Sequence, residues 1–350
     1  MHYSEYFFKK RNIINQEIFN KKINWFFDIK SIFLHKIKSK DVKYFATQLA
    51  NDYQKLRNFN HTKNKPVRIK VGKLENFLKK NKYLKLNNLL KYFQQQDVDK
   101  YFKYFLIQGS VASRDYIVGW SDVDTWTVIK DEILSNPEEL IKLRKILYNF
   151  YKKINSFSKF QHHGIIVYTE KDIKNYLSGY LPKEALINNI VINKNFRGEI
   201  KFFLSNKKKN LSKKILNDKF FFLKKAIKNQ KYNHHVLKKI PRIPFKKNDP
   251  FLFELFYHMG TILNIPILFL DSIGKSSHKK SSFNKFYKLI KNEPVKNFIF
   301  KHEKIRKNWK IYNMKDFNIS KKLLDELGND YFENCLKTYK IILNKIKDTK

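Results

Sequence analysis

Cysteine, glycine and proline are scarce in this chain, and acidic residues are heavily outnumbered. The 350 residues include 1 cysteine, 9 glycines and 8 prolines. The single cysteine, Cys335, excludes an internal disulfide and any zinc site built from several cysteines. No apolar run approaches the roughly 18 residues that a membrane-spanning helix needs, and the N-terminal residues lack the ordered regions of a signal peptide. The sequence therefore predicts a cytoplasmic protein with no membrane partner.

The positive charge is large but comes almost entirely from lysine. The chain has 73 basic and 31 acidic residues, a formal net charge of +42, and only 8 of its basic residues are arginine. Lysine, asparagine, isoleucine, phenylalanine and tyrosine are all abundant, and all have codons rich in A and T, so a coding bias explains the composition without a polyanionic partner. Proteins that read nucleic acids also favour arginine forks. A nucleic-acid partner is therefore possible but not favoured, although a positive field attracts triphosphates.

The hydrophobic pattern indicates a small mixed sheet between two helical regions. A chain of this length buries a substantial core in more than one domain. The expected domains are a helical N-terminal region at 1–95, a core at 96–182 and a mainly helical C-terminal domain at 183–350. In the core the expected elements are strands at 104–108, 122–129 and 162–169, a loop and helix at 110–118, and a helix at 138–157. The predicted fold class is therefore α+β.

Two short motifs in the core carry the chemistry. An apolar run ends in Gly109-Ser110, and Asp122-Val-Asp124 follows before a second apolar run. Carboxylates at i and i+2 on a strand point to the same face, which is how one rigid element holds a divalent metal ion with two side chains. A Gly-Ser turn that opens a helix offers backbone N–H groups and a hydroxyl to a phosphate. Metal, phosphate and paired carboxylates together indicate phosphoryl or nucleotidyl transfer.

The order and spacing of these motifs resemble the DNA polymerase beta-like nucleotidyltransferase superfamily. The string GSVASRD from Gly109, followed by GWSDVD ending at Asp124, looks closest to the small bacterial branch that includes the antibiotic nucleotidyltransferases. The similarity is close over residues 104–130 and loose over 100–180. It implies an α+β nucleotidyltransferase core that is followed by a helical acceptor-side domain.

The resemblance also implies a mechanism and the residues that perform it. Asp122 and Asp124 would ligate one or two Mg²⁺ (or Mn²⁺) ions bound to a nucleoside triphosphate. Ser110 and the backbone N–H groups after Gly109 would hold the β- and γ-phosphates. An acceptor hydroxyl would then attack the α-phosphorus in line and release pyrophosphate, with the protein supplying positioning and electrostatics.

Two further residues are candidates for nucleotide contacts. Arg114 could meet a phosphate, because the guanidinium fork matches phosphate oxygens. Ser121 directly precedes the first aspartate of the metal motif. Asp115, beside Arg114, is equally well explained as a cap or a loop acid.

The superfamily usually places a third carboxylate on a later strand, and no acid lies in the segment 161–169 that would form it. His162 and His163 stand there instead, and an imidazole can act as a metal ligand or a general base. Alternation places only one of the two on the aspartate face, and His163 is the candidate catalytic residue. A second alternative is an acid from elsewhere in the chain, with Glu170, Asp172 and Glu254 as candidates. A third is a protein that binds nucleotide without turning it over.

The leading functional hypothesis is transfer of a nucleoside monophosphate to a hydroxyl of a small molecule, such as a sugar, an antibiotic or another metabolite. Transfer to RNA or protein, and nucleotide binding with degenerate chemistry, are the alternatives. Glu254 and His258 share a helix face at i and i+4. They either contact the acceptor or form a packing pair.

Overall fold

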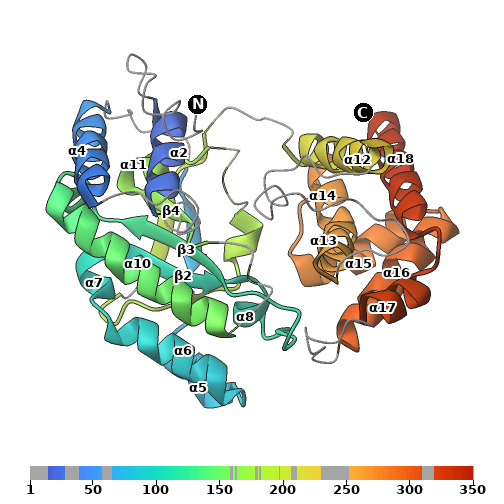
Figure 1. Cartoon of the computed structure of the whole chain (residues 1–350), viewed down its shortest axis with the longest axis horizontal. Coiled ribbons are helices and arrows are strands. Elements are labelled where there is room, and N and C mark those ends of the chain that lie inside the picture. Colours follow the sequence, from blue (N-terminus) through green and yellow to red (C-terminus); the bar gives the residue numbers. More distant parts are fainter. Residues whose placement is uncertain are drawn as a thin grey trace. The chain divides into compact units, whose positions relative to one another are not determined.

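The computed structural model divides into two compact units (Figure 1). It describes residues 15–27, 39–56, 65–157, 161, 164–177, 180, 183–196, 198–205, 211–229, 252–309 and 319–349. Unit 1 comprises Met1–Tyr116 and Ser121–Lys208, and unit 2 comprises Ile117–Trp120 and Lys209–Lys350. The domain boundaries expected after residues 95 and 182 both lie inside unit 1. The predicted α+β class, with a mainly helical C-terminal part, is confirmed.

The main sheet of unit 1 has four strands in the order β4-β3-β2-β5. The strands are β2 (Phe102–Gln108), β3 (Asp124–Ile129), β4 (Val167–Thr169) and β5 (Ile190–Val191). β2 runs antiparallel to both of its neighbours, β3 and β5, whereas β4 lies parallel to β3. β2 and β3 form where the sequence predicted them, and β4 is shorter than the strand expected at 162–169.

The two faces of β2 are covered by different layers, as the alternation of its side chains requires. Phe105 and Ile107 belong to a core cluster that the N-terminal helices and α10 (Pro137–Phe157) share. Tyr104 and Leu106 point to the other face, into a second cluster. A two-stranded antiparallel sheet of β1 (Val67–Lys70) and β6 (Glu199–Phe202) contributes Ile69, Ile200 and Phe202 to that second cluster. The catalytic candidates therefore sit at the end of a sheet that is buried on both sides.

Helices cover one face of the main sheet (Figure 1), and Phe150 of α10 packs against Phe105 of β2 with ring centroids 5.6 Å apart. α10 begins at Pro137, as expected from the first-turn preference of proline, and the Asn136 side chain accepts from the backbone N–H groups of Glu138 and Glu139. The helices of unit 1 are α2 (Gln16–Phe27), α4 (Ser39–Lys55), α5 (Leu74–Lys80), α6 (Leu84–Gln95), α7 (Val98–Tyr101), α8 (Gly109–Ser113), α9 (Asp131–Leu134), α10 (Pro137–Phe157), α11 (Glu170–Lys174) and the 3₁₀ helix η1 (Lys183–Leu186).

Unit 2 is helical in its described residues. Its helices are α12 (Leu211–Asn229), α13 (Leu252–Leu263), α14 (Ile265–Ser272), α15 (Lys279–Leu289), α16 (Glu293–Lys307), α17 (Ile319–Leu327) and α18 (Tyr331–Asp348). Trp120, from the loop between α8 and β3, belongs to this unit and packs against Phe256 and Trp309, with ring centroids 4.6 and 4.8 Å away. None of the helices in the described ranges is long and apolar enough to cross a membrane.

Candidate functional site

The two sequence motifs meet at one end of the β2–β3 pair. β2 ends at Gln108, which pairs with Asp124 at the start of β3, and α8 begins at the next residue, Gly109. Gly109 adopts a φ of +67°, and a Cβ at this position would lie 2.3 Å from the Asp124 Oδ2 atom. Glycine is therefore required twice here, for the left-handed backbone and for the space that the carboxylate fills. The start of α8 and the Asp124 carboxylate are in direct proximity.

The paired aspartates alternate with a buried residue. Val123 is buried in the core, whereas Asp122 and Asp124 on either side of it are only partly buried. Val123 anchors the tripeptide in the core. β3 begins only at Asp124, so Asp122 precedes the strand, and its Oδ2 atom is buried. The strand expected at 122–129 therefore begins two residues later than predicted, and only Asp124 of the aspartate pair lies on it.

Gln161 holds this tripeptide in place from another segment. Its Oε1 accepts from the Val123 N–H at 2.9 Å, and its Nε2 donates to the Val123 carbonyl oxygen at 3.3 Å. The Gln161 side chain is buried, so both bonds form away from solvent, where losing one is costly. No sequence motif identifies Gln161 as part of the site. A glutamine 38 residues away along the chain gives no local signal of this pairing.

Tyr116 is the second residue that the sequence analysis missed. Burial raises the pKa of the Tyr116 hydroxyl, and the nearby Tyr83 and the negative charge of Asp122 raise it further. Its ring stacks on Tyr83, with centroids 6.0 Å apart, and contacts Phe157 at 5.6 Å. A neutral phenol is thus fixed close to the first aspartate, where it can donate a hydrogen bond but does not add negative charge.

The two predicted serines differ in accessibility. Ser110, in the first turn of α8, is half-buried, which leaves its hydroxyl reachable for a ligand. Ser121 is buried, with 4% of its surface exposed. Its burial favours a role in holding the loop before Asp122 over direct contact with a nucleotide.

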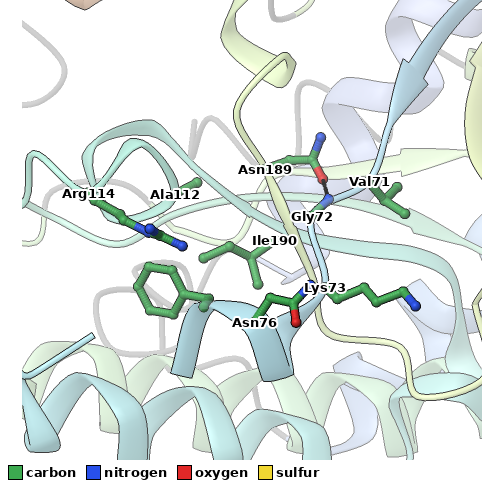
Figure 2. A pocket seen from close by; sticks show the side chains of 9 residues that line it. Val71, Gly72, Lys73, Asn76, Ala112, Arg114, Asn189 and Ile190 are labelled. Carbon is green, nitrogen blue, oxygen red and sulfur yellow. Dashed lines mark hydrogen bonds between the residues drawn. The ribbon is translucent and has the colours of Figure 1, made fainter. Parts of the chain in front are cut away.

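Arg114 lies at the other end of α8 and lines a cavity of about 290 Å³ (Figure 2). It is the C-cap of the helix and has a φ of 60°, the one positive φ of a non-glycine residue in the described ranges. Its guanidinium carbon lies 5.9 Å from the centroid of the Phe77 ring. Arg114 follows Gly109 by five residues, which corresponds to about 7 Å along the helix axis. Arg114 therefore faces this cavity, and Ser110 is the residue of α8 nearer the aspartates.

The wall of the cavity is built around Asn189. Its Oδ1 accepts from the Gly72 N–H at 3.1 Å, and its Nδ2 donates to the Lys70 and Leu186 carbonyl oxygens, each at 2.9 Å. A Cβ on Gly72 would meet the Asn189 carbonyl oxygen at 2.2 Å. Figure 2 shows the Lys73 side chain extending away from Arg114. The two cations therefore do not converge on one point.

The structure describes only part of the segment 161–169, where the resemblance would place a third metal-binding carboxylate. His162 and His163, including the candidate catalytic residue, lie outside the described residues. Of their described neighbours, Gln161 bonds to Val123, and the Ile166 carbonyl oxygen accepts from the Thr127 N–H of β3 at 3.1 Å.

Glu170 and Asp172 belong to the opposite end of the sheet. The parallel register pairs Ile129 with Thr169, so both acids follow the far end of β3. Asp124 lies five residues earlier, about 17 Å away along an extended strand. Neither acid is therefore placed to complete the aspartate pair.

Both acids have structural roles where they stand. Glu170 pairs with Lys103 and accepts from the backbone N–H of Asp131. Asp172 caps α11 and is buried, and burial raises the pKa of its carboxyl. Its oxygens accept from the side chains of Gln16 and Asn20, both in α2, and of Tyr180.

Glu254 and His258, the candidates from the C-terminal part, are both buried in α13 of unit 2. The His258 ring stacks on Phe222 at 6.2 Å and meets Phe332 edge-on at 5.5 Å. These contacts correspond to the packing role that the sequence left open for this pair.

The carboxylates of Asp122 and Asp124 are suitable ligands for a hard divalent cation that also binds the oxygens of a phosphate. Mg²⁺ is usually held by one or two carboxylates together with substrate phosphates, and less often by a cage of protein groups alone. Across the described ranges, no group of three or more His, Cys, Asp and Glu side chains is placed to hold a metal. Asp122 and Asp124 therefore fit an ion that arrives with a triphosphate, and they do not form a closed metal site by themselves.

Comparisons with protein-family models, with curated proteins and with solved structures found no match. They assign no family to the chain. The function is accordingly inferred from the geometry of the residues around Gly109, Asp122 and Asp124.

Proposed function

We propose that the protein is a metal-dependent nucleotidyltransferase that moves a nucleoside monophosphate from a nucleoside triphosphate to a hydroxyl of a small molecule. The observation that carries this proposal is the contact between Gly109, at the start of α8, and the Asp124 carboxylate. A helix start that favours phosphate oxygens and a carboxylate that favours Mg²⁺ are side by side. A metal-bound triphosphate satisfies both at once.

The residues of this chain have distinct roles in the proposed reaction. A bound Mg²⁺ would neutralise charge on the attacking and leaving oxygens. Asp122 and Asp124 hold that ion, and Ser110 with the adjacent backbone N–H groups orients the triphosphate. Gln161 keeps the two aspartates aligned through its bonds to Val123. The proton of the acceptor hydroxyl needs a base near this cluster, and His163 is our candidate.

Nucleotide binding without turnover is the second candidate function. It is favoured by the lack of a third acid beside the aspartate pair in the described ranges. The two functions differ in one measurable quantity, the release of pyrophosphate.

The test is an assay of pyrophosphate release from each nucleoside triphosphate with Mg²⁺ and a panel of sugars, aminoglycosides and other small alcohols. Release that depends on an acceptor supports the proposal. Label from an α-³²P-triphosphate that appears only in RNA or protein would redirect it to a macromolecular acceptor. Binding by calorimetry without release under any acceptor would establish the second candidate.

The base is tested separately with His163→Ala and His162→Ala. We expect the first variant to lose turnover about 100-fold, within the usual range for a general base, while triphosphate affinity stays. Wild-type rates in His163→Ala would remove His163 from the mechanism and leave the aspartate assignment untouched.

A further inference from the structure

The loop between α8 and β3 carries a short segment of unit 2 just before the first aspartate of the metal motif. Its residues Ile117–Trp120 belong to unit 2, whereas the chain on both sides of this segment belongs to unit 1. The Trp120 N–H donates to the Ile117 carbonyl oxygen at 3.0 Å, which closes a turn. Unit 2 therefore holds a turn that ends two residues before Asp122.

An aromatic cluster in unit 2 anchors Trp120. Its ring centroid lies 4.6 Å from that of Phe256 in α13 and 4.8 Å from that of Trp309, which it meets edge-on. Phe256 and Trp309 also contact each other, with centroids 6.1 Å apart. All three side chains are buried, and aromatic rings at such distances attract one another beyond the effect of burial alone. Releasing Trp120 from this cluster is therefore unfavourable.

Unit 1 holds the same stretch of chain at Val123. The N–H and the carbonyl oxygen of Val123 both bond to the Gln161 side chain, and the Val123 side chain is buried. Only Ser121 and Asp122 lie between this anchor and the one at Trp120, and each residue has only two soft backbone dihedrals. While both anchors hold, the backbone of Asp122 has little freedom to move.

The two aspartates are therefore held in different ways. Asp124 is fixed within unit 1, because it lies on β3 and pairs with Gln108 of β2. Asp122 precedes the strand, so its position depends on the anchors on both sides of it, one of which belongs to unit 2. A functional side chain has to be held within about 0.5 Å of its productive position. Loss of either anchor should therefore impair Asp122 as a metal ligand.

We propose that Trp120 is the positioning residue through which unit 2 places the Asp122 carboxylate for metal binding. This inference rests on the nucleotidyltransferase function proposed above, and it gives unit 2 a part in the metal–triphosphate site as well as on the acceptor side. A tryptophan that only fills the core of unit 2 contributes to stability alone. A positioning residue also sets the affinity for the metal-bound triphosphate.

Calorimetry with a Mn²⁺ complex tests this role without turnover. The preformed Mn²⁺ complex of the α,β-methylene analogue of each nucleoside triphosphate is titrated into the full-length protein. We expect Trp120→Leu to weaken binding of this complex about 10- to 100-fold, the range typical of outer-shell partners of metal ligands. Binding of the same analogue in EDTA should not change, because the phosphate contacts of α8 remain. Trp120→Phe keeps an aromatic ring in the cluster and should restore most of the affinity.

Phe256→Leu breaks the same anchor from α13, and it keeps the inference testable if Trp120→Leu does not fold. It should weaken the complex to a similar extent. The double variant should be little worse than either single variant, because both substitutions remove one contact. Phe286→Leu is the matched control: this buried ring of α15 packs edge-on against Phe269 of α14, with centroids 5.6 Å apart. Its loss should leave the affinity unchanged.

The outcomes separate this inference from the proposed function. Wild-type affinity in both Trp120→Leu and Phe256→Leu would overturn the inference and leave the metal site in place. An equal loss in Phe286→Leu would also overturn it, because general destabilisation of unit 2 would then explain the effect. A wild-type protein that does not bind the Mn²⁺ complex would overturn the proposed function, and the inference with it.

Discussion

The backbone of Gly109 leaves no room for a side chain, because the Asp124 carboxylate occupies the place where a Cβ would stand. The gap from that position to Asp124 Oδ2 is 2.3 Å, well below any normal contact. The β2–β3 register fixes this approach by pairing Gln108 with Asp124. Only a glycine at position 109 therefore leaves enough room for the Asp124 carboxylate.

Gly109→Ala should therefore inactivate the proposed transferase. The methyl group displaces Asp124, and a displacement of about 1 Å can lower a rate roughly 100-fold. We expect at least that loss in turnover, with a weaker apparent affinity for Mg²⁺. The measurement is pyrophosphate release as a function of Mg²⁺ concentration.

Gly274→Ala is the matched control for this substitution. Gly274 has a similar φ of +74°, but a Cβ there meets no atom within 4 Å. It carries the same kind of backbone strain, about 1 kcal/mol, without the clash. Similar losses of activity in both variants would show that instability, and not the position of Asp124, explains the effect.

Replacing the two aspartates by asparagine tests whether turnover requires the negative charge of these side chains and not only their size. Asp122→Asn and Asp124→Asn keep the size of each side chain but remove a charged metal ligand. We expect each to lower turnover at least about 100-fold, on the scale of a lost electrostatic contact to the transition state. Asp325→Asn, which alters an exposed carboxylate of α17, should match the wild type. Retained turnover in the double variant would refute the metal-site assignment.

Gln161→Leu tests whether the position of the aspartates depends on the buried amide. It removes both bonds to Val123 and leaves an apolar side chain of similar length. Outer-shell partners of metal ligands typically account for 10–100-fold in affinity or rate, so we expect roughly that loss in Mg²⁺-dependent turnover. Unfolding in urea should show a loss of about 1–3 kcal/mol.

The control for Gln161→Leu is Gln94→Leu, which removes a weaker bond from Gln94 Nε2 to the Ile192 carbonyl oxygen, 3.4 Å long. This variant should keep its Mg²⁺ dependence. If both variants lose stability but neither changes the Mg²⁺ dependence, Gln161 supports the fold alone.

The parts of the site that the sequence predicts are those encoded by neighbouring residues. Alternating burial around Val123, the Gly-Ser turn after β2 and the proline that starts α10 are all local signals. The β-strand pairing of β1 with β6, and the bonds from Gln161 to Val123, join segments far apart in the chain. No periodicity marks such contacts before folding.

The roles of acids are harder still to predict from their positions. Glu170 and Asp172 were reasonable third ligands because they closely follow a strand beside β3. The strand is parallel to β3, however, so its end lies beyond Ile129 and away from Asp124. A three-residue β4 and the capping of α11 by Asp172 decide the matter. The parallel pairing of β4 has no clear signature in the sequence, whereas the capping box of Thr169 and Asp172 is a local pattern that argued against a ligand role for Asp172.

The buried imidazole of His302 should make unit 2 sensitive to acid. Its Nδ1 lies 2.7 Å from the Phe298 carbonyl oxygen, which can only accept, so Nδ1 carries the proton of the neutral ring. Burial lowers the pKa of His302 to about 4, from 6.5. The unfolded chain therefore binds this proton first, and stability falls by about 3 kcal/mol as the pH drops from 6.5 to 4. His302→Phe keeps the aromatic contacts with Phe298 and Tyr331 but cannot titrate. The unfolding free energy of the wild type, measured in urea across this range, should fall by that amount relative to that of the variant. A constant difference would mean that folding does not lower the pKa of His302.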